Sequence, residues 1–237
     1  MSTKSFVILA SGRFEPTQTN NISQNRQRLL EIIKGKPCIS HVIDACSGFN
    51  IPIFVVINHK NIKLETFLKE NHPTVHISKA TGYTMRSTYE VALNVDNNDK
   101  IISAADIWNV KKENMEKYIN SPYKSALYKV SRPWGPDIRS STGNMIRRGD
   151  IGDAVVLISQ EHIDTYYCEE SISKAKEFHK LFYPTEKWDD EKANHLWTWL
   201  DYVFFNEISS CSTHTTNNIE NEKGVIEITD LIYLDND

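Results

Sequence analysis

The segment Phe6-Val-Ile-Leu-Ala-Ser-Gly12 decides the fold. It is a continuous apolar run that ends in two small residues. An apolar run of this length that stops at a small-residue turn is typical of a strand buried on both faces of a sheet. Such a strand usually lies in the centre of a parallel sheet, because helices cover both of its faces.

Further strands and helices alternate along the chain after this segment. Apolar runs predict strands at residues 51–57, 75–77 and 100–105, and helical patterns occupy residues 39–45, 63–70, 85–93 and 113–119. A strand–helix alternation of this kind predicts a parallel, doubly wound sheet. The fold class is therefore α/β, a mostly parallel central sheet flanked by helices on both faces.

The second half of the chain is less regular. It contains a strand pattern at residues 153–158 and helical patterns at residues 171–182 and 191–207, the last of them rich in aromatic residues. Residues 209–223 form a polar linker, and residues 225–233 could add a late edge strand. We expect one α/β domain over residues 1–208 and a linker with a C-terminal tail over residues 209–237.

Composition excludes several classes of function. The 237 residues carry a formal net charge of −4, so no basic field favours a nucleic acid partner. No apolar stretch is long enough for a membrane span, and the N-terminal run is too short for a signal peptide. The four cysteines form no C-x-x-C pair, which predicts free thiols in a reducing, cytoplasmic compartment. The oligomeric state stays open.

Ligands of open parallel sheets gather beyond the carboxyl ends of the strands, and three features fall there. Ser11-Gly12-Arg13 can offer backbone N–H groups and a guanidinium to phosphate oxygens, although Ser11-Gly12 alone could be a plain tight turn. Arg26 and Arg28 follow a loop long enough to cover a ligand. Asp106 ends a strand and could hold Mg²⁺ against a triphosphate, or it could cap the next helix.

These residues also resemble a known family. Ile8-Leu-Ala-Ser-Gly-Arg13, Gln27-Arg-Leu-Leu-Glu-Ile-Ile-Lys-Gly-Lys-Pro37 and Ile39-Ser-His-Val-Ile43 are similar to the opening of GT-A-type nucleotidyltransferases. That family includes sugar-1-phosphate nucleotidyltransferases and phosphocholine cytidylyltransferases. Asp99-Lys-Ile-Ile-Ser-Ala-Ala-Asp106 resembles the strand that ends in the family's aspartate. The resemblance covers about residues 5–120 and implies a Rossmann-like GT-A fold.

The resemblance also implies an activity and a set of site residues. It implies Mg²⁺-dependent transfer of a nucleoside monophosphate from a nucleoside triphosphate to a small phosphorylated acceptor, such as a sugar 1-phosphate, with release of pyrophosphate. The implied residues are Ala10, Ser11, Gly12, Arg13, Gly82 and Ser87 for the nucleotide, Arg13 and Arg28 for catalysis, Asp106 and Asp201 for the metal, and Trp134 and Arg147 for the acceptor.

Three positions depart from the family pattern. Phe14 replaces its second glycine, Pro16 falls at its signature arginine, and Arg28 replaces a lysine. A nucleotide-binding protein that has lost catalysis on the same scaffold therefore stays an alternative. A GT-A-like glycosyltransferase that uses a nucleotide-sugar is another, although Asp106-Ile-Trp108 lacks the second carboxylate of its D-x-D motif.

Overall fold

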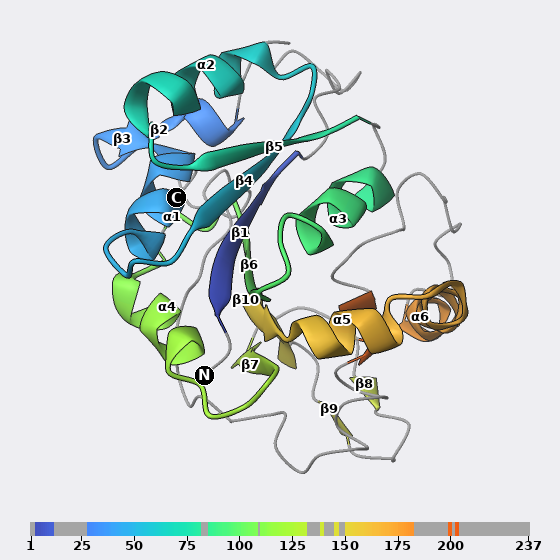
Figure 1. Cartoon of the computed structure of the whole chain (residues 1–237). Helices are drawn as coiled ribbons and strands as arrows, with labels where there is room; N and C mark the ends of the chain where they lie inside the picture. The colour runs from blue at the N-terminus through green and yellow to red at the C-terminus, as the bar shows by residue number, and fades with distance from the viewer. Residues whose placement is uncertain are drawn as a thin grey trace, which may run out of the picture.

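The computed structural model describes residues 3–11, 28–81, 85–108, 110–131, 138–139, 145–146, 150–182, 199–200 and 202–203. In this part of the chain the main sheet has six strands, in the order β5-β4-β1-β6-β10-β7 (Figure 1). They are β1 (Lys4–Ala10), β4 (Ile53–Asn58), β5 (His76–Ala80), β6 (Asp99–Ala104), β7 (Ala126–Ser131) and β10 (Asp150–Ile158).

Four neighbouring strands of this sheet are parallel. β1 pairs in parallel with β4 on one side and with β6 on the other, and β4 pairs in parallel with β5. β10 runs antiparallel to both β6 and β7. The expected mostly parallel α/β sheet is therefore confirmed. Two short hairpins accompany it, β2 (Ile32–Ile33) with β3 (Lys36–Pro37) and β8 (Ile138–Arg139) with β9 (Met145–Ile146).

Helices cover both faces of the sheet (Figure 1). One face carries α1 (Cys38–Cys46), α2 (Ile62–Asn71) and α4 (Lys112–Ile119), which share a core with the sheet. The other face carries α3 (Met85–Leu93), α5 (Gln160–Tyr166), α6 (Glu169–Phe182) and the segment around Trp199. A 3₁₀ turn, η1 (Arg28–Leu30), precedes the first hairpin.

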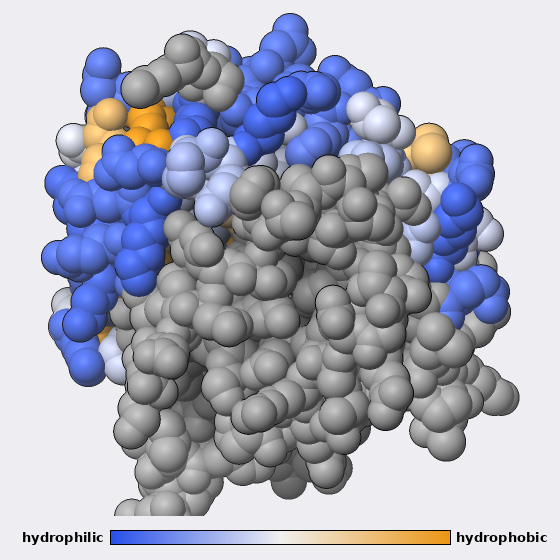
Figure 2. Space-filling view, turned by 90° about the horizontal axis from the view of Figure 1, so that it is seen from below, coloured by the Kyte–Doolittle hydropathy of each residue, from blue (hydrophilic) through white to orange (hydrophobic). Residues whose placement is uncertain are grey.

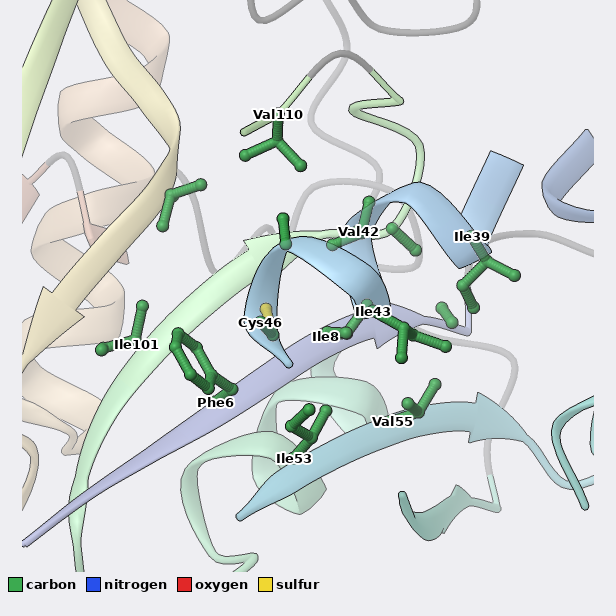
Figure 3. Close-up of a cluster of buried hydrophobic side chains, with 14 of the residues drawn as sticks. Phe6, Ile8, Ile39, Val42, Ile43, Cys46, Ile53, Val55, Ile101 and Val110 are labelled. Atoms are coloured by element: carbon green, nitrogen blue, oxygen red, sulfur yellow. The ribbon is translucent and has the colours of Figure 1, made fainter. Parts of the chain in front are cut away.

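The alternation of side chains in β1 supplies both cores. Phe6 and Ile8 point toward α1, and Val7 points to the opposite core; all three are fully buried. Figure 3 shows Phe6 and Ile8 among Ile39 and Val42 of α1 and side chains of β4 and β6. Because successive strand residues face opposite sides, a strand that is apolar at every position needs cover on both faces.

Most of the expected elements occur within a few residues of their predicted bounds. The structure adds elements that the sequence analysis did not expect: the strand β7, the helix α5, the short strand pairs β2–β3 and β8–β9, and the 3₁₀ turn η1. Cys38, Cys46 and Cys168 are free thiols, as expected. Trp199 and Tyr202 are buried within the segment predicted as an aromatic helix. Leu200 and Val203 of that segment are buried as well, whereas its other residues, the linker and the late strand lie outside the described residues.

The described surface seen in Figure 2 is mainly hydrophilic. Among the described residues, the exposed large apolar side chains are those of Ile32, at 67%, and Ile62, at 60%. No helix in the described ranges combines the length and the apolar character that a membrane crossing requires.

A buried lysine organises the amino end of β6. The Lys100 ammonium lies 2.9 Å from the carbonyl oxygen of Asp96, 2.9 Å from Oε1 of Gln160 and 3.0 Å from a carboxylate oxygen of Asp96. It also donates to the carbonyl of Asn98, and the Ser5 hydroxyl donates to the Asp96 carboxylate. Hydrogen bonds thus join β1, β6 and α5 at the end of the sheet opposite the carboxyl ends of the parallel strands.

We expect Lys100→Met to lower the free energy of unfolding by about 3 kcal/mol, the lower end of the range for breaking a buried ion pair. The reason is that the part-buried acceptors around the ammonium would lose their buried donor. Urea denaturation measures the change. Lys124→Met is the matched control: its ion pair with Glu161 is exposed and should contribute less than about 1 kcal/mol. Equal losses in the two variants would contradict a structural role for the buried network.

Candidate functional site

The order of the parallel strands sets a topological switch point at one edge of the sheet. From β1 the chain moves outward to β4 and β5, and it then returns to place β6 on the other side of β1. The strand order therefore reverses between β1 and β6. In open α/β sheets, ligands bind outside the carboxyl ends of the strands at this switch point.

Two of the predicted site residues follow the strands that flank the switch point. The pairing of β1 with β6 ends at Leu9 and Ala104. Ser11 and Asp106 each come two positions after these paired residues. The register therefore brings both residues to the same edge of the sheet, although 95 positions separate them in sequence.

Ser11 is held in place by a residue that the sequence analysis missed. Its hydroxyl forms a hydrogen bond with the hydroxyl of Thr88 in α3, and the two residues are 8% and 3% exposed. Helix α3 follows β5 in the chain, so this hydrogen bond joins the end of β1 to α3. Ser87, predicted to bind the nucleotide, precedes Thr88 and is half-buried.

The spacing of buried residues along α3 is a sequence signal that could have identified Thr88. Thr88 and Ala92 are four positions apart, and both are buried. Residues at this spacing share one face of a helix. A polar residue on the inward face of a predicted helix needs a hydrogen-bond partner, and that requirement points to a role for Thr88.

Asp106 lies in the turn that follows β6. Its side chain is half-buried, and its neighbours Ala105 and Ile107 are 2% and 0% exposed. It does not cap the next helix, because α4 takes Lys111 as its N-cap residue, and the Lys111 N–H donates to Asn114 Oδ1 at 2.8 Å. The alternative interpretation of Asp106 as a helix cap is therefore wrong.

The segment with the strongest family resemblance forms a structural turn. Residues 32–37 make the β2–β3 hairpin, and its two central residues, Lys34 and Gly35, have φ angles of 48° and 85°. Two consecutive positive φ angles are typical of a two-residue hairpin turn, which favours glycine. Lys36 forms an ion pair with Asp44 of α1. The Gly35-Lys36-Pro37 block therefore anchors the hairpin to α1.

The remaining predicted site residues are only partly described. Ala10 is buried at the end of β1 and packs into the core. Arg28 begins η1, which packs against α1, and its side-chain contacts lie outside the description. Gly12, Arg13, Gly82, Trp134, Arg147 and Asp201 lie outside the described residues.

The donor set around Asp106 limits the kind of metal site that it could join. Within the described ranges, no three His, Cys, Asp or Glu residues gather as a ready metal site. Mg²⁺ commonly binds one or two carboxylates and completes its coordination with water and substrate phosphates. A single half-buried carboxylate at the switch point therefore fits a Mg²⁺ ion that arrives with a triphosphate.

Comparison with known proteins shows which solved structures share this fold. The sequence matches no family model, and no curated protein matches it. Solved structures do match over nearly the whole chain. A 4-diphosphocytidyl-2C-methyl-D-erythritol synthase from Anaerococcus prevotii has a TM-score of 0.58 at 14% identity, over 98% of this chain and 94% of the other. The CTP:phosphocholine cytidylyltransferase of Streptococcus pneumoniae has a TM-score of 0.58 at 16% identity, over 98% and 97%.

The chain has the GT-A-like fold of these nucleotidyltransferases. A second 4-diphosphocytidyl-2C-methyl-D-erythritol synthase gives a TM-score of 0.56 at 11% identity, over 99% of this chain and 97% of that one. The resemblance seen in residues 5–120 is thus confirmed at the level of the fold, and the likeness extends into the second half of the chain.

We expect Thr88→Val to lower the free energy of unfolding by about 1–2 kcal/mol, because the buried Ser11 hydroxyl loses its partner. A double-mutant cycle with Ser11→Ala, followed by urea denaturation, should give a coupling energy of about 1 kcal/mol. Thr165→Val is the control, since Thr165 is exposed on α5 and donates only to its own helix. Additive losses from the two substitutions would show that the hydroxyls do not act together.

Proposed function

We propose that this chain is a Mg²⁺-dependent nucleotidyltransferase. It joins the nucleoside monophosphate of a nucleoside triphosphate to a small phosphorylated acceptor, in the first place a sugar 1-phosphate, and releases pyrophosphate. The observation that carries the proposal is the convergence of Ser11 and Asp106 on the switch point between β1 and β6. The fold supports it, since solved structures with this fold include cytidylyltransferases.

The reaction is a substitution at phosphorus. A phosphate oxygen of the acceptor forms a bond to the α-phosphorus of the triphosphate, and the bond from that phosphorus to the bridging oxygen of pyrophosphate breaks. The transferred group carries charge throughout, so catalysis depends mainly on positioning and on charge neutralisation. Such a site needs cationic and N–H donors around phosphates and a carboxylate for a metal ion.

The residues at the end of β1 can meet the first of these needs. The backbone N–H groups of Ser11 and Gly12 would face the nucleotide, together with Ala10, because a small-residue turn leaves room for a phosphate or a base. The Ser11–Thr88 bond would hold the start of this turn. Arg13 and Arg28 would neutralise the triphosphate, since a guanidinium donates to two phosphate oxygens at once.

Other residues would complete the nucleotide and acceptor sites. Gly82 and Ser87 would contact the base, and Trp134 and Arg147 would bind the acceptor. Asp106, with Asp201 as the second candidate, would hold Mg²⁺ through carboxylate oxygens. A bound Mg²⁺ supplies charge stabilisation for the phosphate oxygens in the transition state.

Ligand binding gives the first test of this proposal. The melting temperature would be measured with CTP, UTP, GTP, ATP and dTTP, each with and without MgCl₂. A ligand at about 100 times its Kd stabilises a protein by about 2.7 kcal/mol, which is roughly 5–10 °C for a chain of this size. A Mg²⁺-dependent shift with one base would select the donor for a pyrophosphate-release assay with sugar phosphates and phosphocholine.

The outcomes also separate the alternatives. A triphosphate that binds without release of pyrophosphate with any acceptor would identify a nucleotide-binding protein that no longer catalyses. Stabilisation by UDP- or GDP-sugars, and not by triphosphates, would identify a glycosyltransferase. The absence of a shift with every triphosphate would contradict the proposal.

We expect Asp106→Asn to lower the rate of pyrophosphate release by about 100-fold or more, because the amide gives up the charge that holds the metal. It should also remove the Mg²⁺-dependent part of the nucleotide-induced shift. Asp164→Asn is the matched control, since Asp164 lies exposed on α5 and accepts from Gln160. A loss of about tenfold or less in Asp106→Asn would contradict the metal role.

A further inference from the structure

The turn that carries Asp106 is fixed to the rest of the molecule by a tryptophan. Trp108 lies two positions after Asp106, and its ring contacts residues from two other segments. The Lys34 ammonium lies 4.5 Å from the centre of the ring. The His41 imidazole approaches the ring at 6.3 Å between centroids, with an interplanar angle of 73°.

These contacts close a small network around the β2–β3 hairpin. Lys34 occupies the hairpin turn with a φ angle of 48°, and His41 belongs to α1. Nε2 of His41 lies 2.8 Å from the carbonyl oxygen of Ile33, the residue that precedes Lys34. The Cys38 N–H donates to the carbonyl oxygen of Glu31 at 2.9 Å, and Lys36, directly after the turn, forms an ion pair with Asp44, so α1 is bonded to the chain on both sides of the turn. Trp108 thus touches a hairpin that is already fixed to α1.

No hydrogen bond from the indole N–H to a described residue holds the Trp108 ring in its position. Nε1 of Trp108 is buried and has no hydrogen-bond partner among the residues that the structure describes. A buried donor without an acceptor costs about 1–3 kcal/mol, so the contacts of the ring faces and edges must hold the side chain against that cost. A cation over an indole face contributes about 0.5–2 kcal/mol, and an edge-on aromatic pair contributes in a similar range.

We propose that Trp108 is a positioning residue for Asp106. Its ring, held by Lys34 and His41, fixes the turn after β6 to the β2–β3 hairpin and so sets where the Asp106 carboxylate stands at the switch point. The role of Asp106 in this statement rests on the proposed function, and the link between turn and hairpin does not. The aromatic ring of Trp108 positions Asp106, and the indole N–H does not contribute to this positioning.

The structure provides a graded series of variants. Trp108→Phe keeps an aromatic face and removes the N–H, Trp108→Ala removes the ring, and Lys34→Met removes the cation. Lys112→Met is the matched control, because Lys112 lies 4.6 Å from the ring centre of Phe49, in a second cation–π pair that does not involve the Asp106 turn.

The first measurement is hydrogen exchange of the full-length chain by mass spectrometry. In Trp108→Ala, amides of residues 104–111 and of residues 31–37 should both exchange about tenfold faster. Trp108→Phe and Lys112→Met should match the wild type in both segments, and Lys34→Met should fall between. Faster exchange in residues 104–111 alone would show that the ring does not link the turn to the hairpin, and it would overturn the proposal.

The second measurement tests the position of the Asp106 carboxylate through the affinity for Mg²⁺ in the presence of CTP. The MgCl₂ concentration for half of the CTP-induced thermal shift should rise about tenfold in Trp108→Ala, as expected when a group that orients a metal ligand is removed. Trp108→Phe should restore the wild-type value. An unchanged Mg²⁺ midpoint in Trp108→Ala, or an equal rise in Trp108→Phe, would overturn the proposal.

The two measurements also separate failure of this inference from failure of the proposed function. A wild-type chain that shows no Mg²⁺-dependent shift with CTP or any other triphosphate would contradict the proposed function. The exchange rates would then still decide whether Trp108 fixes the Asp106 turn. A wild-type chain that binds, together with a Trp108→Ala variant that binds equally well, would contradict only the positioning role.

Discussion

The parallel pairing of β1 with β6 is the constraint on which the rest of the structure depends. Six consecutive residue pairs join the strands, from Lys4–Asp99 to Leu9–Ala104. Because Phe6, Ile8 and Ile101 face one core and Val7 and Ile102 face the other, a shift by one position would exchange every side chain between the faces. The register is therefore fixed by burial, and it determines which residues emerge together at the carboxyl edge.

The apolar core fixes the frame, and the polar residues of the site lie in the turns that leave it. Ser11 and Asp106 are not part of either strand, and each is placed by its own neighbour. A hydroxyl pair with Thr88 holds Ser11, and buried residues on both sides hold the turn of Asp106. A site built in this way can change its polar residues without loss of the core.

Sequence reasoning succeeded where burial alone decides the structure. The apolar runs of β1, β4 and β6 and the amphipathic pattern of α1 were sufficient to predict these strands and this helix. It missed α5, because this helix has seven residues and buries Ile163 alone, so no apolar period marks it. Its one local signal is Ser159, whose side chain accepts from the His162 N–H as an N-cap. It also missed β7, which lies at the edge of the sheet and, in the described part of the chain, pairs with the antiparallel β10.

The site was harder to predict than the fold, because its key relations are long-range. Ser11 and Thr88 are far apart in sequence, and no local pattern pairs their hydroxyls. For Asp106, a helix cap and a ligand were equally consistent with the sequence. The structure rejects the cap, since Lys111 takes that position at the start of α4. Five residues thus separate Asp106 from the first residue of α4, so the helix does not orient the carboxylate, and tertiary contacts such as those of Trp108 take on that role.

The two ends of the β1–β6 pair differ in a way that bears on where a ligand can bind. At the amino end, Lys100 is fully buried, and the carbonyl, amide and carboxylate oxygens around it satisfy its three N–H donors. Polar groups that satisfy one another in this way leave nothing to attract a ligand and stiffen that end of the sheet. At the carboxyl end, the Asp106 carboxylate stays half-exposed in a turn. The same two strands therefore end in a mutually satisfied polar network at one edge of the sheet and in a turn with a half-buried carboxylate at the other, so under the proposed function a charged ligand would bind at the carboxyl edge.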